Sequence, residues 1–168
     1  MKNKIFVVLV SSAIIFTGCV PTAQPKMQKS QLQIRQFQTK TYDNKNLKMI
    51  MKAVMDTLQD DDFIVKQTNI DLGLITAQKE IDVEDFGEAF FMTLFAGSQA
   101  AYKKSSIITA SANISNFGKK TRVRINFQIK TLDNWGRVMK VQPVMDSKYY
   151  QKFFSKVDKA IFLAEQNI

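Results

Sequence analysis

The sequence predicts an α+β domain in which an antiparallel sheet of about five or six strands carries two amphipathic helices on one face. Apolar and polar residues alternate over 122–130, which is the period of a strand with one buried face. Apolar residues recur at helical spacing over 47–58 and again over 150–164. The elements follow one another in the order β-α-β-β-insert-β-β-β-α, which favours helices packed against an antiparallel sheet.

The first two predicted elements are a strand and a helix. Residues 32–41 are rich in β-branched, aromatic and Gln residues and predict a strand, although its alternation slips between Ile34 and Phe37. Residues 42–44 offer capping side chains, and the following helix is expected to end near residues 59–62. The apolar stripe of this helix is Leu47, Ile50, Met51, Val54 and Leu58.

Two pairs of strands follow in the middle of the chain. The first pair covers residues 63–66 and 74–79, and its turn contains Gly73, a residue suited to positive φ. The second pair covers residues 108–114 and 123–129, on either side of a predicted turn at 116–119.

The last strand and helix complete the sheet and its cover. A turn at 133–136 leads to a strand at 138–142, which Pro143 ends. Asp146 and Ser147 are expected to cap the final helix. Its apolar stripe is Tyr150, Phe153, Phe154, Val157, Ile161 and Ala164.

An aromatic insert at residues 83–102 interrupts this order. On a helical wheel most of its apolar residues share one face, but Phe91 and Phe95 fall on the polar side as an i, i+4 pair. The insert is interpreted either as a core helix that is apolar almost all round or as a patch for a partner or a lipid surface. Gly87 and Gly97 weaken any helix, so an aromatic-rich loop is a third interpretation.

The composition excludes several kinds of chemistry. The 168 residues include no His and one Cys, so His-dependent triads, His metal sites and internal disulfides are ruled out. No nucleophile-elbow, Ser-x-x-Lys or phosphate-loop motif is present, and we predict no catalytic residue, metal or cofactor. The formal net charge of +9 initially suggests nucleic acid as a partner.

The N-terminus has the pattern of an export signal. Lys2 and Lys4 precede a twelve-residue, mainly apolar run at 5–16, which is too short to span a bilayer but has the length of a signal-peptide core. The run ends in Phe16-Thr17-Gly18-Cys19, which resembles the bacterial lipobox, the motif that is cleaved just before a Cys whose thiol carries a diacylglyceryl group. The alternative is an ordinary secretory signal with an incidental Cys.

The lipobox resemblance implies a domain organisation and a location. It implies a signal peptide at 1–18, a lipidated Cys19 with a flexible tether at 19–31, and a single periplasmic domain at 32–168. Val20 after the Cys, by resemblance to the sorting rules of enteric bacteria, favours the outer membrane with the domain facing the periplasm. In an exported protein the positive charge points to anionic envelope surfaces and argues against nucleic acid.

The clearest candidate surface is a basic strand face. Arg122, Arg124 and Lys130 share the polar side of one strand, with Lys119 and Lys120 at the turn before it. This face suits anionic lipid head groups, lipopolysaccharide or an acidic protein, while the alternative is simply a solvated sheet face. Trp135 lies in the next turn, where it is either an exposed anchor or a residue folded back onto the core.

Two acidic groups are weaker candidates. The run at 60–62 supplies three carboxylates but lacks the spacing of a calcium loop. It lies at the negative end of a helix, an unfavourable position that calls for a Lys partner or a cation. Glu80, Asp82, Glu84 and Asp85 form the second group, and nothing in the sequence places them in the cleft that glycosidase chemistry needs.

Three segments resemble a group of small bacterial lipoproteins of unassigned function. They are Arg35-Gln36-Phe37-Gln38-Thr39, Leu58-Gln59-Asp60 with Phe63, and Leu72-Gly73-Leu74-Ile75-Thr76. The resemblance covers about 50 residues and carries no catalytic motif. The element order is also similar to that of the helix-on-sheet domains of the C-component lipoprotein of the outer-membrane β-barrel assembly machine.

These observations together favour a lipid-anchored, non-enzymatic cell-envelope protein that acts as an accessory or assembly subunit. Phe91 and Phe95 are its predicted apolar contacts, and Arg122, Arg124 and Lys130 its predicted anionic contacts. The expected partner is an envelope protein or an anionic lipid or glycan surface. A periplasmic carrier of a lipid or glycan is the alternative, and a cell-wall-acting enzyme is the least favoured class.

Overall fold

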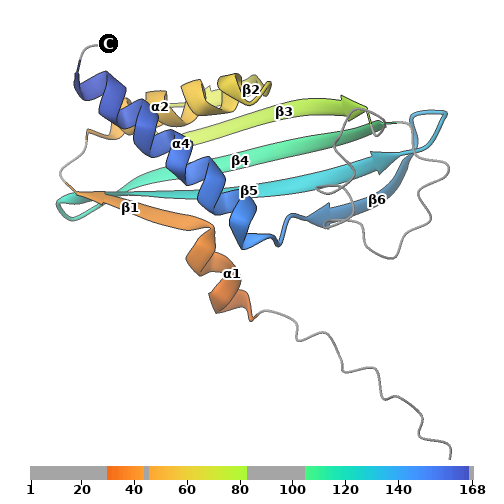
Figure 1. Cartoon of the computed structure of the whole chain (residues 1–168), viewed down its shortest axis with the longest axis horizontal. Helices are drawn as coiled ribbons and strands as arrows, with labels where there is room; N and C mark the ends of the chain where they lie inside the picture. The colour runs from red at the N-terminus through yellow and green to blue at the C-terminus, as the bar shows by residue number, and fades with distance from the viewer. Residues whose placement is uncertain (1–29, 44–45, 83–104, 167–168) are drawn as a thin grey trace, which may run out of the picture.

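The structure, a computed structural model, describes residues 30–43, 46–82 and 105–166. Within these ranges six strands form one antiparallel sheet and three helices pack around it (Figure 1), which confirms the predicted α+β class. The signal segment, Cys19 and the whole insert at 83–102, which includes Phe91 and Phe95, lie outside the described residues.

The sheet is centred on a long hairpin, β4–β5. Its strand order is β1-β5-β4-β3-β2, and β6 also pairs with β5. The outer edge of β5 is therefore shared, since β1 pairs with residues 120–124 and β6 with residues 128–132. The strands are β1 (Thr39–Asp43), β2 (Ile64–Asn69), β3 (Leu74–Asp82), β4 (Ser105–Phe117), β5 (Lys120–Leu132) and β6 (Val138–Pro143).

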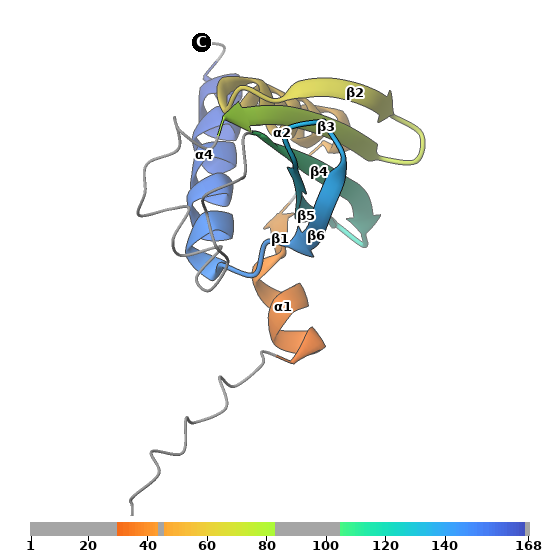
Figure 2. The ribbon, with the colours of Figure 1, turned by 90° about the vertical axis from the view of Figure 1, so that its right-hand side faces the viewer.

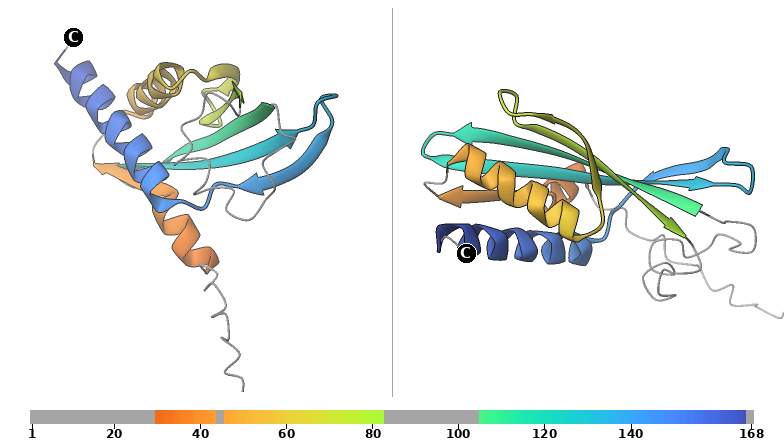
Figure 3. Two further views of the ribbon diagram at one scale, coloured as in Figure 1. Left: turned by 45° about the vertical axis from the view of Figure 1, so that its right-hand side comes forward. Right: turned by 90° about the horizontal axis from the view of Figure 1, so that it is seen from above.

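Two helices cover one face of this sheet. α2 (Leu47–Asp60) and α4 (Ser147–Glu165) contact each other and lie on the same side of the strands (Figures 2 and 3). The predicted apolar stripes are buried except at their ends, since Leu47 of α2 is half-buried and Ala164 of α4 is exposed. Ala53 and Thr57 of α2 are buried as well. Asp146 caps α4 as predicted, whereas α2 is capped by Asn46 and not by residues 42–44.

The N-terminal segment departs from the prediction. Residues 32–41 do not form one strand, because α1 (Gln31–Phe37) precedes β1. Ser30 and Gln33 form a capping box in which each backbone N–H donates to the other residue's side chain, at 2.8 and 3.3 Å. The slip in the alternation is the i, i+3 spacing of a helix, which turns Ile34 and Phe37 to the same side. Gln31, assigned by sequence to the tether, is the first residue of α1.

On the edge of β5 that β1 and β6 share, residues 125–127 pair with neither strand. Other groups supply the backbone hydrogen bonds there. The N–H of Ile125 donates to the carbonyl of Gln38 at 3.0 Å, and the N–H of Val144 donates to the carbonyl of Phe127 at 2.9 Å. The N–H of Phe127 donates to the Tyr150 hydroxyl at 3.2 Å. A buried side chain from α4 therefore replaces a strand in this part of the sheet.

Candidate functional site

The outer face of the sheet, away from α2 and α4, is polar because β4 and β5 alternate strictly. In both strands every second residue is buried against the helices, and the residues between them face outward. The buried apolar residues of the two strands are Ile108, Ala110, Ala112, Ile114, Val123, Ile125, Phe127 and Ile129. This alternation places Arg122 and Arg124 together on the outer face.

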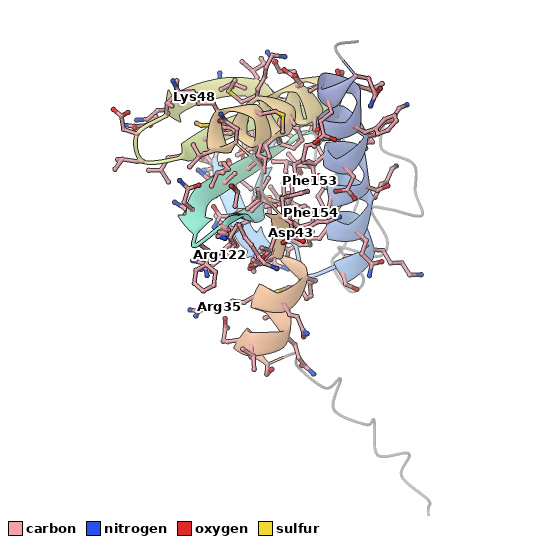
Figure 4. The ribbon with its side chains drawn as sticks, turned by 90° about the vertical axis from the view of Figure 1, so that its left-hand side faces the viewer. Arg35, Asp43, Lys48, Arg122, Phe153 and Phe154 are labelled. Atoms are coloured by element: carbon pink, nitrogen blue, oxygen red, sulfur yellow. The ribbon has the colours of Figure 1, made fainter. Side chains whose placement is uncertain are left out.

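A groove of about 570 Å³ lies on the outer face, beside α1 and β1. We call it the arginine groove. Figure 4 shows Arg35 and Arg122 on the same side of the molecule, whereas Phe153 and Phe154 lie between the sheet and α4. The residues that line the groove are Arg35, Thr39, Ser111, Asn113, Arg122, Arg124 and Asn126.

Strand register surrounds the two arginines of β5 with uncharged polar residues. Arg124 is opposite Asn113 of β4 on one side and Thr39 of β1 on the other. Arg122 is likewise opposite a Ser and a Thr, at positions 115 and 41. Residues directly opposite each other in an antiparallel pair have neighbouring side chains. The floor of the groove therefore combines guanidinium groups with amide and hydroxyl groups.

The charges of the arginine groove are not neutralised within the described chain. No Asp or Glu lines it, and Arg35, Arg122 and Arg124 form no ion pair with a described residue. Two lysines of the neighbouring strands do have acidic partners, since Lys40 pairs with Asp158 at 2.5 Å and Lys120 with Asp43 at 2.8 Å.

Two of the guanidinium groups have defined surroundings. The Nε of Arg124 is buried and has no hydrogen-bond partner among the described residues. A buried donor without a partner costs about 1–3 kcal/mol, more when it is charged, so it favours any ligand that accepts its hydrogen bond. The guanidinium of Arg122 lies 5.2 Å from the centroid of the Phe117 ring, a cation–π contact that restrains it near the groove.

This arrangement suits the binding of an anion. Guanidinium groups donate paired hydrogen bonds that match carboxylate and phosphate oxygens, and the Asn, Ser and Thr side chains can both donate and accept. The lining of the groove includes the hydroxyl groups of Thr39 and Ser111 and no carboxylate, thiol or phenol. Its residues are equipped to hold a negatively charged group.

The predicted site residues are brought together only in part. Arg122 and Arg124 line the groove, but Lys130 lies six residues further along β5, opposite Val141 of β6, at a distance of roughly 20 Å along the strand. Arg35 is not among the predicted site residues, because the sequence predicts its segment as a strand. The i, i+3 spacing of Ile34 and Phe37, together with Ser30 and Gln33, is the signal that could have found it.

The acidic groups form no metal-binding cluster in the described ranges. No three His, Cys, Asp or Glu side chains come together there. Asp61 forms an ion pair with Lys156 of α4, and its carbonyl accepts a hydrogen bond from Lys79 at 2.9 Å, so the unfavourable helix end has Lys partners. Glu80 and Asp82 lie in β3, whereas Glu84 and Asp85 lie outside the described residues.

Comparisons with known proteins give only distant similarities. No protein-family model matches the sequence, and no curated protein does. A DUF4468 family protein from Bacteroides ovatus is 9% identical, with 73% of this chain and 84% of that chain covered and a TM-score of 0.40. A TBP-like protein from Parabacteroides distasonis is 13% identical, with 73% and 90% covered and a TM-score of 0.38.

None of the described helices is both long enough and apolar enough to cross a membrane.

Proposed function

We propose that the chain is a lipid-anchored, non-enzymatic cell-envelope protein whose domain binds an anionic group of another envelope component in the arginine groove. The observation that carries this proposal is the cluster of Arg35, Arg122 and Arg124, which has no acidic partner among the described residues. The buried, unpartnered Nε of Arg124 adds to it. The lipobox-like sequence at 16–19 supports the anchor.

The anchor and the groove support each other in physical terms. A lipid on Cys19 would hold the domain near the membrane, so its concentration relative to other envelope components would be high. Charge-assisted hydrogen bonds on an exposed face are weakened by salt, and such contacts benefit most from a raised local concentration. An accessory or assembly subunit is therefore the role that this combination favours.

Crosslinking from inside the groove is the experiment that tests this function. A photoreactive amino acid in place of Asn113, which lines the groove opposite Arg124, is expected to capture the anionic component in intact envelopes. The same amino acid in place of Lys48, an exposed residue of α2, provides the control position. Identical crosslinks from both positions would contradict the proposal.

Removal of two positive charges from the groove is expected to weaken this binding. In the variant with Arg122→Gln and Arg124→Gln, capture should fall at least roughly 100-fold, because two charged hydrogen bonds at about 1.5–3 kcal/mol each together contribute about 3–6 kcal/mol. The control variant, Lys48→Gln with Lys159→Gln, loses the same charge from exposed helix positions and should bind normally. Capture that is equal in the two variants would show that net charge, and not the groove, recruits the partner.

Replacement of Cys19 is expected to abolish the anchor. Two or three acyl chains hold a protein stably, at about 0.8 kcal/mol per buried CH₂, so Cys19→Ser should lose lipid labelling and leave the membrane fraction. Metabolic labelling with a fatty acid, followed by fractionation of the envelope, measures both effects. If the variant stays membrane-bound with unchanged labelling, the lipobox interpretation is wrong.

A further inference from the structure

A second surface of the domain exposes apolar side chains in the β5–β6 turn, along β6 and just after it. Trp135 in the turn is 79% exposed, which decides between the two interpretations of this residue in favour of an exposed one. Four more apolar side chains are 40–57% exposed on β6 and just after it, namely Val138, Met139, Val141 and Met145. We call these five residues the tryptophan patch. Val138 and Val141 share one face of the sheet, because they are opposite Leu132 and Lys130 of β5, and exposed apolar side chains that lie together mark interaction sites.

The turn holds Trp135 in place. The Asp133 carboxylate accepts hydrogen bonds from the backbone N–H of Trp135 at 2.9 Å and of Arg137 at 2.8 Å, and from Arg137 Nε at 2.7 Å. The Arg137 guanidinium lies 4.9 Å from the centroid of the Trp135 ring. The ring is thus restrained outside the core by a cation–π contact, and it loses little conformational freedom when it binds.

The charges near the patch are mostly positive. Residues 130–145 contain Lys130, Arg137 and Lys140 and only one acidic residue, Asp133. Desolvation raises the pKa of Asp133, but the hydrogen bonds from Arg137 and Trp135 outweigh it and leave the pKa below its ordinary value. The carboxylate is therefore ionised at neutral pH and is engaged within the turn.

We propose that the tryptophan patch docks on the surface of a lipid bilayer that contains anionic head groups. Trp prefers the membrane interface, where its ring is apolar and its N–H remains hydrated, and Lys and Arg beside it reach the phosphates. The charge complementarity with anionic lipid is what selects a bilayer over a neutral apolar partner. This docking goes beyond the proposed function, since it orients a domain that the anchor already holds at the membrane, and it does not require the arginine groove.

The sequence provides a direct probe, because Trp135 is the only Trp in the chain. We expect the full chain, reconstituted into vesicles of phosphatidylcholine with phosphatidylglycerol, to show Trp135 fluorescence at a shorter wavelength than the same chain in buffer without vesicles. Brominated phospholipids in the same vesicles should quench this emission. The matched control is Trp135→Phe with Phe162→Trp, which moves the single Trp to an exposed position on α4. Its emission should not be quenched.

Removal of the two lysines tests the charge requirement. With Lys130→Gln and Lys140→Gln, the ratio of docked to undocked Trp135 in the anionic vesicles is expected to fall roughly thirty-fold. On vesicles of phosphatidylcholine alone, the unchanged protein and the double-lysine variant should both dock as weakly as the variant does on anionic vesicles. Trp135 emission that resembles exposed Trp and resists quenching in the anionic vesicles overturns the proposal and leaves a protein surface as the occupant. Equal quenching of the control variant overturns it as well, and neither result bears on the groove or the anchor.

Discussion

The substitution Gly73→Ala is expected to lower the free energy of unfolding by about 2–5 kcal/mol. Gly73 has a φ of +62°, a conformation that costs an L-residue about 1–2 kcal/mol. A Cβ at this position would lie 1.9 Å from the carbonyl oxygen of Ile114 in β4. Neither backbone can move away easily, because the N–H of Ile114 donates to the carbonyl of Gly73 at 2.7 Å. The resulting overlap adds about 1–3 kcal/mol. Urea unfolding measures the total loss as a shift of the midpoint at an unchanged m-value.

Gly118→Ala is the matched control for this prediction. Gly118, in the β4–β5 turn, has nearly the same φ of +61°, but a Cβ there has no neighbour within 4 Å. Gly118→Ala should therefore lower the free energy of unfolding only by the cost of placing an L-residue at positive φ, about 1–2 kcal/mol. Equal losses of stability in the two variants would mean that the close approach of Gly73 to Ile114 has no energetic effect.

The substitution Tyr150→Phe is expected to cost about 2–3 kcal/mol although it removes a single oxygen atom. The Tyr150 hydroxyl accepts from the N–H of Phe127 and from the Gln38 side chain, both at 3.2 Å, and donates to the carbonyl of Val144 at 3.1 Å. Burial raises the pKa of this hydroxyl above its ordinary value even though the hydrogen bonds from Phe127 and Gln38 oppose the shift, so it stays protonated and able to donate. Without it, three buried polar groups lose their partner, and each can cost about 1–3 kcal/mol before water or relaxation compensates.

Thr131→Val separates the loss of a hydrogen bond from the loss of a buried hydroxyl. The hydroxyl of Thr131 is also buried, but it has no hydrogen-bond partner among the described residues. Its replacement by Val should therefore change the free energy of unfolding little or even raise it. The comparison uses denaturation midpoints of both variants. A loss with Thr131→Val as large as that with Tyr150→Phe would show that the three hydrogen bonds of the Tyr150 hydroxyl are not what stabilises the sheet.

Local patterns were sufficient for most of the fold. The alternation over 122–130 predicted the buried and exposed faces of β5, because side chains of a strand point to opposite sides at every step. The stripes of α2 and α4 were also predictable, since one helix face must be apolar to cover a sheet. α1 was not, because a seven-residue helix contains too few turns for its period to stand out from a strand with one irregularity.

The candidate site depends on long-range order to a greater degree. The period of β5 was enough to place Arg122 and Arg124 on one polar face. Which residues join them was decided by the pairing of β5 with β1 and β4 and by the position of α1, which bring Thr39, Asn113 and Arg35 to the same groove. Periodicity describes neighbours within one element, whereas a binding site collects side chains from segments that only strand pairing and helix packing make adjacent.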